Sequence, residues 1–199
     1  MARKGRILVD GGIYHITSRG HNRYRLFHDF KDYKAYKDII RKYKKEFAFE
    51  LFHYCLMPNH IHLLLKILKA VDLPHLLQCL NQAYAKQYKR SYSLIGNLFQ
   101  GRYKSIFIER DSYLLDCGRY IERNPYRAGM VKDPSDYLWS SCKFYTKGRN
   151  DDIITADPLY EGLDQDRSER MRKYYEYLLE NRPYEHIIDR AMMLQGVPI

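Results

Sequence analysis

The most constraining feature of this chain is a pair of histidines inside a nearly unbroken apolar run. His60 and His62 lie in the run 52–65, with only Ile61 between them. Successive side chains on a β-strand point to opposite faces, so both imidazoles would project from one side of a strand. That geometry offers two nitrogens to one metal ion, but buried imidazoles satisfied by backbone carbonyls give the same pattern. The pair alone leaves both interpretations open.

The same run predicts a β-hairpin. Residues 49–56 and 60–68 both have the composition of strands, and the turn-forming trio Met57-Pro58-Asn59 separates them. The two strands would therefore pair in antiparallel fashion, with the histidines at the head of the second strand.

The rest of the first 125 residues alternates strand and helix patterns. Helical spacing predicts one helix capped by Asp29, a second from Asp72 to about Arg90, and a third that ends before Pro125. The remaining expected features are a strand at 7–18 interrupted at Gly11-Gly12, a strand at 98–109 in which Arg102 and Lys104 share a face, and a cap for the third helix at Asp111-Ser112. This β-α-β-β-α-β order predicts an α+β protein with a ferredoxin-like split βαβ sheet, helices on one face and the other face free for a ligand.

The distribution of charge favours a polyanionic partner. The 199 residues carry a net charge of +10, yet the part from Asp151 onward is acidic, so the positive excess lies in the first 150 residues. The chain also has 20 tyrosines. Aromatic rings beside Lys and Arg are what proteins use to stack the bases of single-stranded nucleic acid and neutralise its backbone.

Composition also bears on location and redox state. No stretch approaches the roughly 18 consecutive apolar residues of a membrane span, and no hydrophobic signal core follows the N-terminus, so we expect a cytoplasmic protein with no membrane partner. The four cysteines, at positions 55, 79, 117 and 142, show no Cys-x-x-Cys spacing and are expected to be buried, reduced thiols.

Five short motifs resemble one known family, and they occur in that family's order. They are Tyr14-His15-Ile16-Thr17-Ser18-Arg19-Gly20, Met57-Pro58-Asn59-His60-Ile61-His62, Phe99-Gln100-Gly101-Arg102-Tyr103-Lys104, the segment 120–131 that begins Tyr120-Ile121-Glu122-Arg123-Asn124-Pro125, and Trp139-Ser140-Ser141. Together they resemble the single-tyrosine HUH transposases, particularly the REP-associated tyrosine transposases and insertion-sequence transposases. The resemblance implies a catalytic domain at 1–145. Residues 146–199 are expected to form a polar linker and a C-terminal helical extension, with helices at 168–180 and 184–194.

The resemblance implies sequence-specific cleavage and rejoining of single-stranded DNA that carries a hairpin. It makes Tyr120 the nucleophile, and it makes His60, His62 and Asn124 the ligands of a divalent ion, Mg²⁺ or Mn²⁺. Two imidazoles and an amide oxygen leave such an ion open positions that a scissile phosphate can fill. Attack by the tyrosine would give a covalent 5′-phosphotyrosine and a free 3′-hydroxyl, so that rejoining needs no ATP.

Several positions admit a second interpretation. Tyr120 and Asn124 are one helical turn apart and share a face, but Asn124 before Pro125 is equally typical of a helix N-cap. Glu122 is expected to be a solvated charge on the helix surface, and His15 has no predicted side of its strand. The expected contacts to the DNA backbone, each weighed against ordinary solvated surface, are Arg19, Arg23, Arg102 and Lys104.

Two other functions remain open. A phosphodiesterase would keep the histidine metal site but use water, and a domesticated single-strand-binding protein would have no chemistry. The intact residues His60, His62 and Tyr120 argue against the domesticated protein. The resemblance implies a bacterial, nucleoid-associated protein and favours a monomer over the homodimer of the shorter insertion-sequence relatives.

Overall fold

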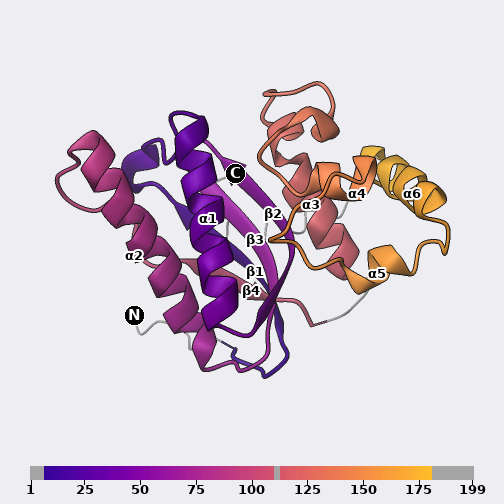
Figure 1. The fold of residues 1–199 in the computed structure, drawn as a ribbon, viewed down its shortest axis with the longest axis horizontal. Coiled ribbons are helices and arrows are strands. Elements are labelled where there is room, and N and C mark those ends of the chain that lie inside the picture. The colour runs from indigo at the N-terminus through magenta and orange to yellow at the C-terminus, as the bar shows by residue number, and fades with distance from the viewer. Residues whose placement is uncertain (1–6, 110–112, 181–199) are drawn as a thin grey trace.

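Four strands form a single antiparallel sheet in the order β2-β3-β1-β4, which is the predicted ferredoxin-like order (Figure 1). The structure is a computed structural model that describes residues 7–109 and 113–180. The strands are β1 (Ile13–Arg19), β2 (Phe49–Met57), β3 (His60–Ile67) and β4 (Lys104–Phe107). Strands β2 and β3 form the expected hairpin, with a register shift between Leu51 and His53.

The helices divide between the two faces of the sheet. Helices α1 (Phe30–Glu46) and α2 (Asp72–Tyr92) cover one face, and α3 (Leu114–Arg127) lies on the other side of the sheet (Figure 1). The short helices α4 (Cys142–Lys147) and α5 (Pro158–Glu161) and the longer α6 (Arg167–Leu179) gather around α3. The sequence predicted that the second face would be free. That prediction is wrong, because α3 covers part of this face.

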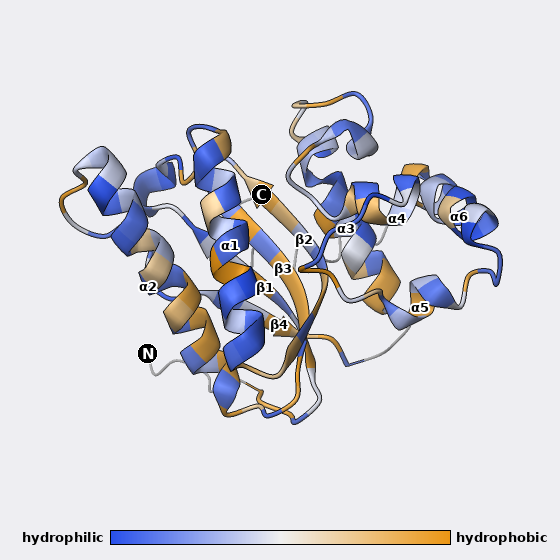
Figure 2. Ribbon diagram, viewed as in Figure 1, coloured by the Kyte–Doolittle hydropathy of each residue, from blue (hydrophilic) through white to orange (hydrophobic). Residues whose placement is uncertain are grey.

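Alternation along β3 explains why the sheet has two packed faces. Ile61, Leu63 and Leu65 belong to the core that α1 and α2 complete, whereas Leu64 packs in a second cluster with Tyr120 of α3. Figure 2 shows this pattern as hydrophobic strands between helices that are largely hydrophilic on their outer sides. The histidines have the same parity as Leu64, so they lie on the α3 face.

Three of the predicted helices are confirmed, namely α1, α2 and α6. Asp29 caps α1 by accepting hydrogen bonds from the backbone N–H groups of Lys31 and Asp32. Helix α2 runs two residues beyond Arg90, and α6 matches the helix expected at 168–180. The other expected helix, at 184–194, and the cap at Asp111-Ser112 lie outside the described residues.

Two strands are shorter than the sequence indicated, in each case because of a glycine turn. Gly11 has φ of +70°, and the N–H of Gly12 closes a turn on the carbonyl of Val9 at 2.9 Å, so β1 begins only at Ile13. Gly101, with φ of +68°, turns the chain before β4. Arg102 therefore lies in a bend outside the strand and does not share a strand face with Lys104.

Helix α3 continues through Pro125 instead of ending before it. Pro125 lacks the N–H that would bond the carbonyl of Ile121. The side-chain Nδ2 of Asn124 substitutes for it, donating to the carbonyl oxygens of Ile121 at 3.3 Å and Tyr120 at 2.9 Å. Asn124 is therefore not an N-cap, because the helix extends on both sides of it.

The predicted polar linker after α4 is held against α1. Lys37 pairs with Asp151 at 2.8 Å, and Arg41 donates to Asp152. The hydroxyl of Tyr54 on β2 also donates to Asp151 at 2.7 Å. This segment therefore packs as part of the fold and does not behave as a free connection.

The remaining expectations from composition can be compared directly. All four cysteines are free thiols, buried at 55, 117 and 142 and partly buried at 79. None of the helices within the described ranges combines the length and apolar character that crossing a bilayer requires.

Candidate active site

His60 and His62 present their Nε2 atoms on the α3 face of β3. Their ring centroids are 4.9 Å apart. Each ring uses its other nitrogen locally: Nδ1 of His60 lies 2.6 Å from Oδ1 of Asn59, and Nδ1 of His62 lies 2.9 Å from Nε2 of His15. Within the described residues, neither Nε2 atom has a hydrogen-bond partner.

All three imidazoles of this cluster are neutral at neutral pH. Burial, followed by the charge of Arg19, lowers the pKa of His60 to about 4. Burial lowers the pKa of His15 to about 3. Burial again, together with the neighbouring histidines and Arg127, lowers the pKa of His62 well below its usual value. Because a neutral imidazole keeps a lone pair, these rings are in the form that binds cations.

His15 is a member of the cluster that the sequence did not assign to a side. It is fully buried on β1, its Nδ1 has no described hydrogen-bond partner, and its ring lies edge-on to Tyr120 at 6.0 Å between centroids. Strand register explains its position, because Thr17 pairs directly with His62 and His15 has the same parity as Thr17. A correct prediction of the register between β1 and β3 would have placed His15 in this cluster.

Tyr120 of α3 lies beside His62 and His15. Its ring is edge-on to His62 at 6.2 Å, and the guanidinium carbon of Arg127 lies 5.2 Å from its centroid. Only 2% of its surface is exposed. Asn124 sits one turn further along α3, where its Nδ2 is used by the helix carbonyls and its Oδ1 accepts no hydrogen bond from a described residue.

Glu122 is buried, and the expectation of a solvated charge is wrong. Its carboxylate accepts hydrogen bonds from Ser141 at 2.6 Å, from His53 at 2.8 Å and from Tyr174 at 2.9 Å. These partners come from β2, the start of α4 and α6. The residue that fixes the position of the Tyr120 helix was therefore missed from the sequence, because its partners lie far away along the chain.

The four predicted DNA-contact residues come from β1, β4 and two loops near the end of β1. Arg19 pairs with His60 in the sheet, and Lys104 of β4 pairs with Thr17. The N–H of Gln100 bonds the carbonyl of Arg19 at 2.8 Å, which brings the loop of Arg102 close to β1. Arg23, in the short turn η1 (His21–Arg23), and Arg102 are exposed.

The donor set on this face suits a divalent ion with open coordination positions. In the part of the chain that the structure describes, no three His, Cys, Asp or Glu side chains group to hold a metal. The predicted ligands are His60 and His62 on β3 and Asn124 on α3. Such a set leaves positions for substrate oxygens.

Comparison with solved structures identifies the fold, and comparison with protein families identifies the chain. A REP-associated tyrosine transposase bound to a REP hairpin matches with a TM-score of 0.63 and 21% identity over 79% of this chain and 93% of that one. The mixed α/β architecture is thus a transposase fold. The family model for IS200-like transposases matches residues 9–124, more than half of the chain, which therefore belongs to the IS200-like transposase family.

A second solved structure is more distant. It is a putative transposase from Deinococcus radiodurans R1, with a TM-score of 0.43 and 24% identity over 61% of this chain and 97% of that one. A search of curated proteins gave no significant match.

Proposed function

We propose that this transposase cleaves and rejoins single-stranded DNA through Tyr120, with a divalent ion bound by His60, His62 and Asn124. One observation carries the proposal: Tyr120 packs edge-on against His62, on the sheet face where the Nε2 atoms of the two neutral histidines have no hydrogen-bond partner among the described residues. A nucleophile and two metal donors would then act on the same phosphate.

In the proposed reaction, the tyrosine oxygen forms a bond to phosphorus as the bond from phosphorus to the 3′ oxygen breaks. The tyrosine loses its proton, the leaving oxygen gains one as a 3′-hydroxyl, and the 5′ side remains as a phosphotyrosine. A different 3′-hydroxyl then reverses the step and regenerates Tyr120. One phosphodiester replaces another in each step, so no ATP is consumed. Mg²⁺ or Mn²⁺, when bound, would stabilise the charge that develops on the phosphoryl oxygens.

Residues around the reacting groups support these roles. The Arg127 guanidinium beside the Tyr120 ring places a positive charge next to the proposed nucleophile. Asn59 and His15 bind the Nδ1 atoms of His60 and His62, and such partners orient a ring so that Nε2 faces the metal. His15 and Asn59 are therefore proposed as positioning residues.

We propose hairpin-bearing single-stranded DNA as the substrate, since the solved REP-associated tyrosine transposase is bound to a REP hairpin. Arg19, Arg23, Arg102 and Lys104 surround the end of β1 next to His60 and would contact the phosphate backbone. Because each neutralised phosphate releases counterions, binding should weaken steeply with added salt.

We further propose that Tyr120 acts on the histidine site of its own chain, in a monomer. Glu122, two residues from Tyr120, is bonded to His53 of the same chain's β2, inside the fully buried core. This contact supports the proposal because it holds α3 against its own sheet, where Tyr120 packs edge-on against His62 of the same chain.

The test is adduct formation with labelled, hairpin-bearing single strands and Mn²⁺, analysed on a denaturing gel. Wild-type protein should yield a metal-dependent covalent band, and Tyr120→Phe should yield none. Tyr126→Phe is the matched control, since Tyr126 lies on the same helix but is 43% exposed and away from the histidines. Cleavage without any adduct would instead establish a hydrolase. Binding without cleavage, across varied hairpins, would establish a binding protein.

A further inference from the structure

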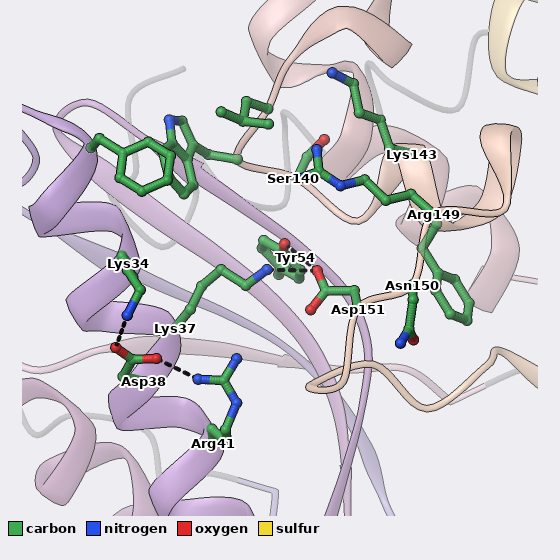
Figure 3. Close-up of a pocket in the computed structure, with 14 residues that line it drawn as sticks. Lys34, Lys37, Asp38, Arg41, Tyr54, Ser140, Lys143, Arg149, Asn150 and Asp151 are labelled. Atoms are coloured by element: carbon green, nitrogen blue, oxygen red, sulfur yellow. Dashed lines mark hydrogen bonds and ion pairs between the residues drawn. The ribbon is translucent and has the colours of Figure 1, made fainter.

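A pocket lies on the opposite side of the sheet from the histidines. It has a volume of about 210 Å³ and opens between α1 and the segment 138–151 (Figure 3). Tyr54 and Ser140 form its base, at the edge strand β2. Tyr54 packs in the core shared with α1, not in the α3 cluster that holds Tyr120, so this pocket is separate from the candidate active site.

Positive charge dominates the walls of this pocket. Lys34, Lys37 and Arg41 come from α1, and these three are paired with aspartates. Lys143 and Arg149 line the opposite wall (Figure 3). Neither of their side chains has a hydrogen bond or ion pair with a described residue. The pocket therefore holds two cations that are not neutralised locally, which favours an anionic ligand.

Two aromatic side chains, Phe30 and Trp139, also line this pocket. Phe30 is 60% exposed, an unusual exposure for a phenylalanine, and its ring is edge-on to Trp139 at 4.9 Å between centroids. Trp139 also stacks in parallel on Tyr33, with 4.4 Å between ring centroids, which fixes the indole in place. Aromatic rings and unpaired cations that line one pocket are the combination that binds a base and its phosphate.

The size of the pocket restricts what it can accept. Sites for drug-sized molecules begin at about 300 Å³, so this pocket suits a smaller group, such as one base. A duplex offers no free base face to Phe30, and an acidic peptide would match the charge without using the rings. The combination of volume, rings and cations therefore fits one unpaired nucleotide best.

We propose that this pocket binds a single unpaired nucleotide of a single-stranded nucleic acid, with the base against Phe30 and Trp139 and a phosphate between Lys143 and Arg149. The proposal rests on the proposed function only for the expectation that the strand is DNA. Binding requires neither a metal ion nor Tyr120, so it can be tested apart from catalysis.

Trp139 is the only tryptophan in the chain, so its fluorescence reports directly on the pocket. The experiment titrates full-length Tyr120→Phe protein, without divalent metal, with a short oligothymidylate that has no hairpin. We expect a saturable change in Trp139 fluorescence. Phe30→Ala should weaken binding roughly tenfold, the scale of one lost base–aromatic stack. The double variant Lys143→Ala/Arg149→Ala should weaken it at least as much.

A charge-matched control removes two exposed lysines of α2, in Lys86→Ala/Lys89→Ala. It should retain nearly full affinity. Equal weakening by the control and the pocket variants would overturn the proposal, because it would indicate diffuse electrostatics. An equally strong response to duplex DNA or to polyglutamate would also overturn it. A tighter response to oligothymidylate than to oligouridylate would support DNA as the ligand, and the reverse would support RNA in the same pocket.

The two proposals fail in distinguishable ways. If the wild-type protein forms no covalent adduct but Trp139 fluorescence still responds to single strands, the proposed chemistry is refuted and the nucleotide pocket is supported. A normal adduct with no response of Trp139 to any single strand would refute the pocket alone. Far-ultraviolet circular dichroism of each variant establishes that the fold is retained.

Discussion

His53 donates a hydrogen bond from Nδ1 to the carboxylate of Glu122 at 2.8 Å, and both side chains are fully buried. The other ring nitrogen of His53 lies 3.1 Å from Asp157, which is buried as well. A buried imidazole between two carboxylates is stable only as the charged form with its hydrogen bonds complete. The His53–Glu122 pair connects β2 to the helix of Tyr120. The contact between His53 and Asp157 connects β2 to the start of α5 as well.

The charge on His53 predicts how stability depends on pH. Burial by itself lowers the pKa of His53, but the charge of Glu122 and the hydrogen bonds that His53 donates to Asp157 and Glu122 outweigh it and raise the pKa to about 9. The folded protein therefore holds a proton that the unfolded chain releases near pH 6.5. This stabilisation is complete below pH 6.5 and is lost as the pH rises through 9, by up to about 3 kcal/mol of unfolding free energy. Urea denaturation between pH 6 and 9.5 measures it.

Glu122→Gln should flatten that pH dependence. The amide keeps the shape of the side chain but removes the charge that raises the pKa of His53, so the loss of stability on going from pH 7 to 9 should shrink. Glu46→Gln is the control, because Glu46 is an exposed partner of Lys42 on α1. If the two variants show the same pH profile as wild type, the His53–Glu122 pair is not the titrating unit.

Another prediction concerns Gly118, one turn before Glu122. A Cβ atom built there would lie 2.5 Å from Nε2 of His53, within the buried network. Helix propensity alone would make Gly118→Ala stabilising by about 1 kcal/mol, but the clash should reverse the sign and destabilise the protein by about 1–3 kcal/mol. Gly162→Ala meets only atoms at 3.6 Å or more and should be nearly neutral. Thermal melting of both variants distinguishes steric clash from propensity.

The elements that could be predicted from the sequence depend on local patterns. The β2–β3 hairpin follows from a turn trio between two apolar runs, and the shared face of His60 and His62 follows from strand alternation. The cap at Asp29 is likewise a local signal. Each of these requires only neighbours within a few residues.

The polar residues of α3 could not be placed in this way. The helix is enclosed by the sheet on one side and by the C-terminal helices on another, so polar residues are buried on nearly all of its faces. Arg119 donates to the carbonyl of Tyr177, and Arg123 to that of Leu178, each more than 50 residues away. A pattern of charges on a helix cannot distinguish such distant partners from solvent, which is why Glu122 was assigned to the surface.

The paired roles of Asn124 and Pro125 predict an interaction between two mutations. Asn124→Ala should cost about 1 kcal/mol, since it leaves the carbonyls of Tyr120 and Ile121 without their side-chain donor. In a Pro125→Ala background the new backbone N–H bonds Ile121, so the same Asn124→Ala change should cost less. Urea denaturation of the four proteins in this double-mutant cycle gives the coupling energy. Strict additivity would show that Asn124 does not compensate for the proline.

The last prediction separates the metal-positioning role of His15 from a packing role. Nε2 of His15 lies 2.9 Å from Nδ1 of His62, the nitrogen that would face away from a bound ion. Removing such a partner usually weakens metal affinity by about 10- to 100-fold. His15→Phe, which keeps an aromatic ring but removes both nitrogens, should therefore reduce Mn²⁺ affinity by that factor in a calorimetric titration. His15→Gln, which retains a hydrogen-bonding group, should recover part of the loss, and His75→Phe on the exposed side of α2 should have no effect. Unchanged Mn²⁺ affinity in His15→Phe, with binding abolished in His62→Ala, would make His15 a packing residue only.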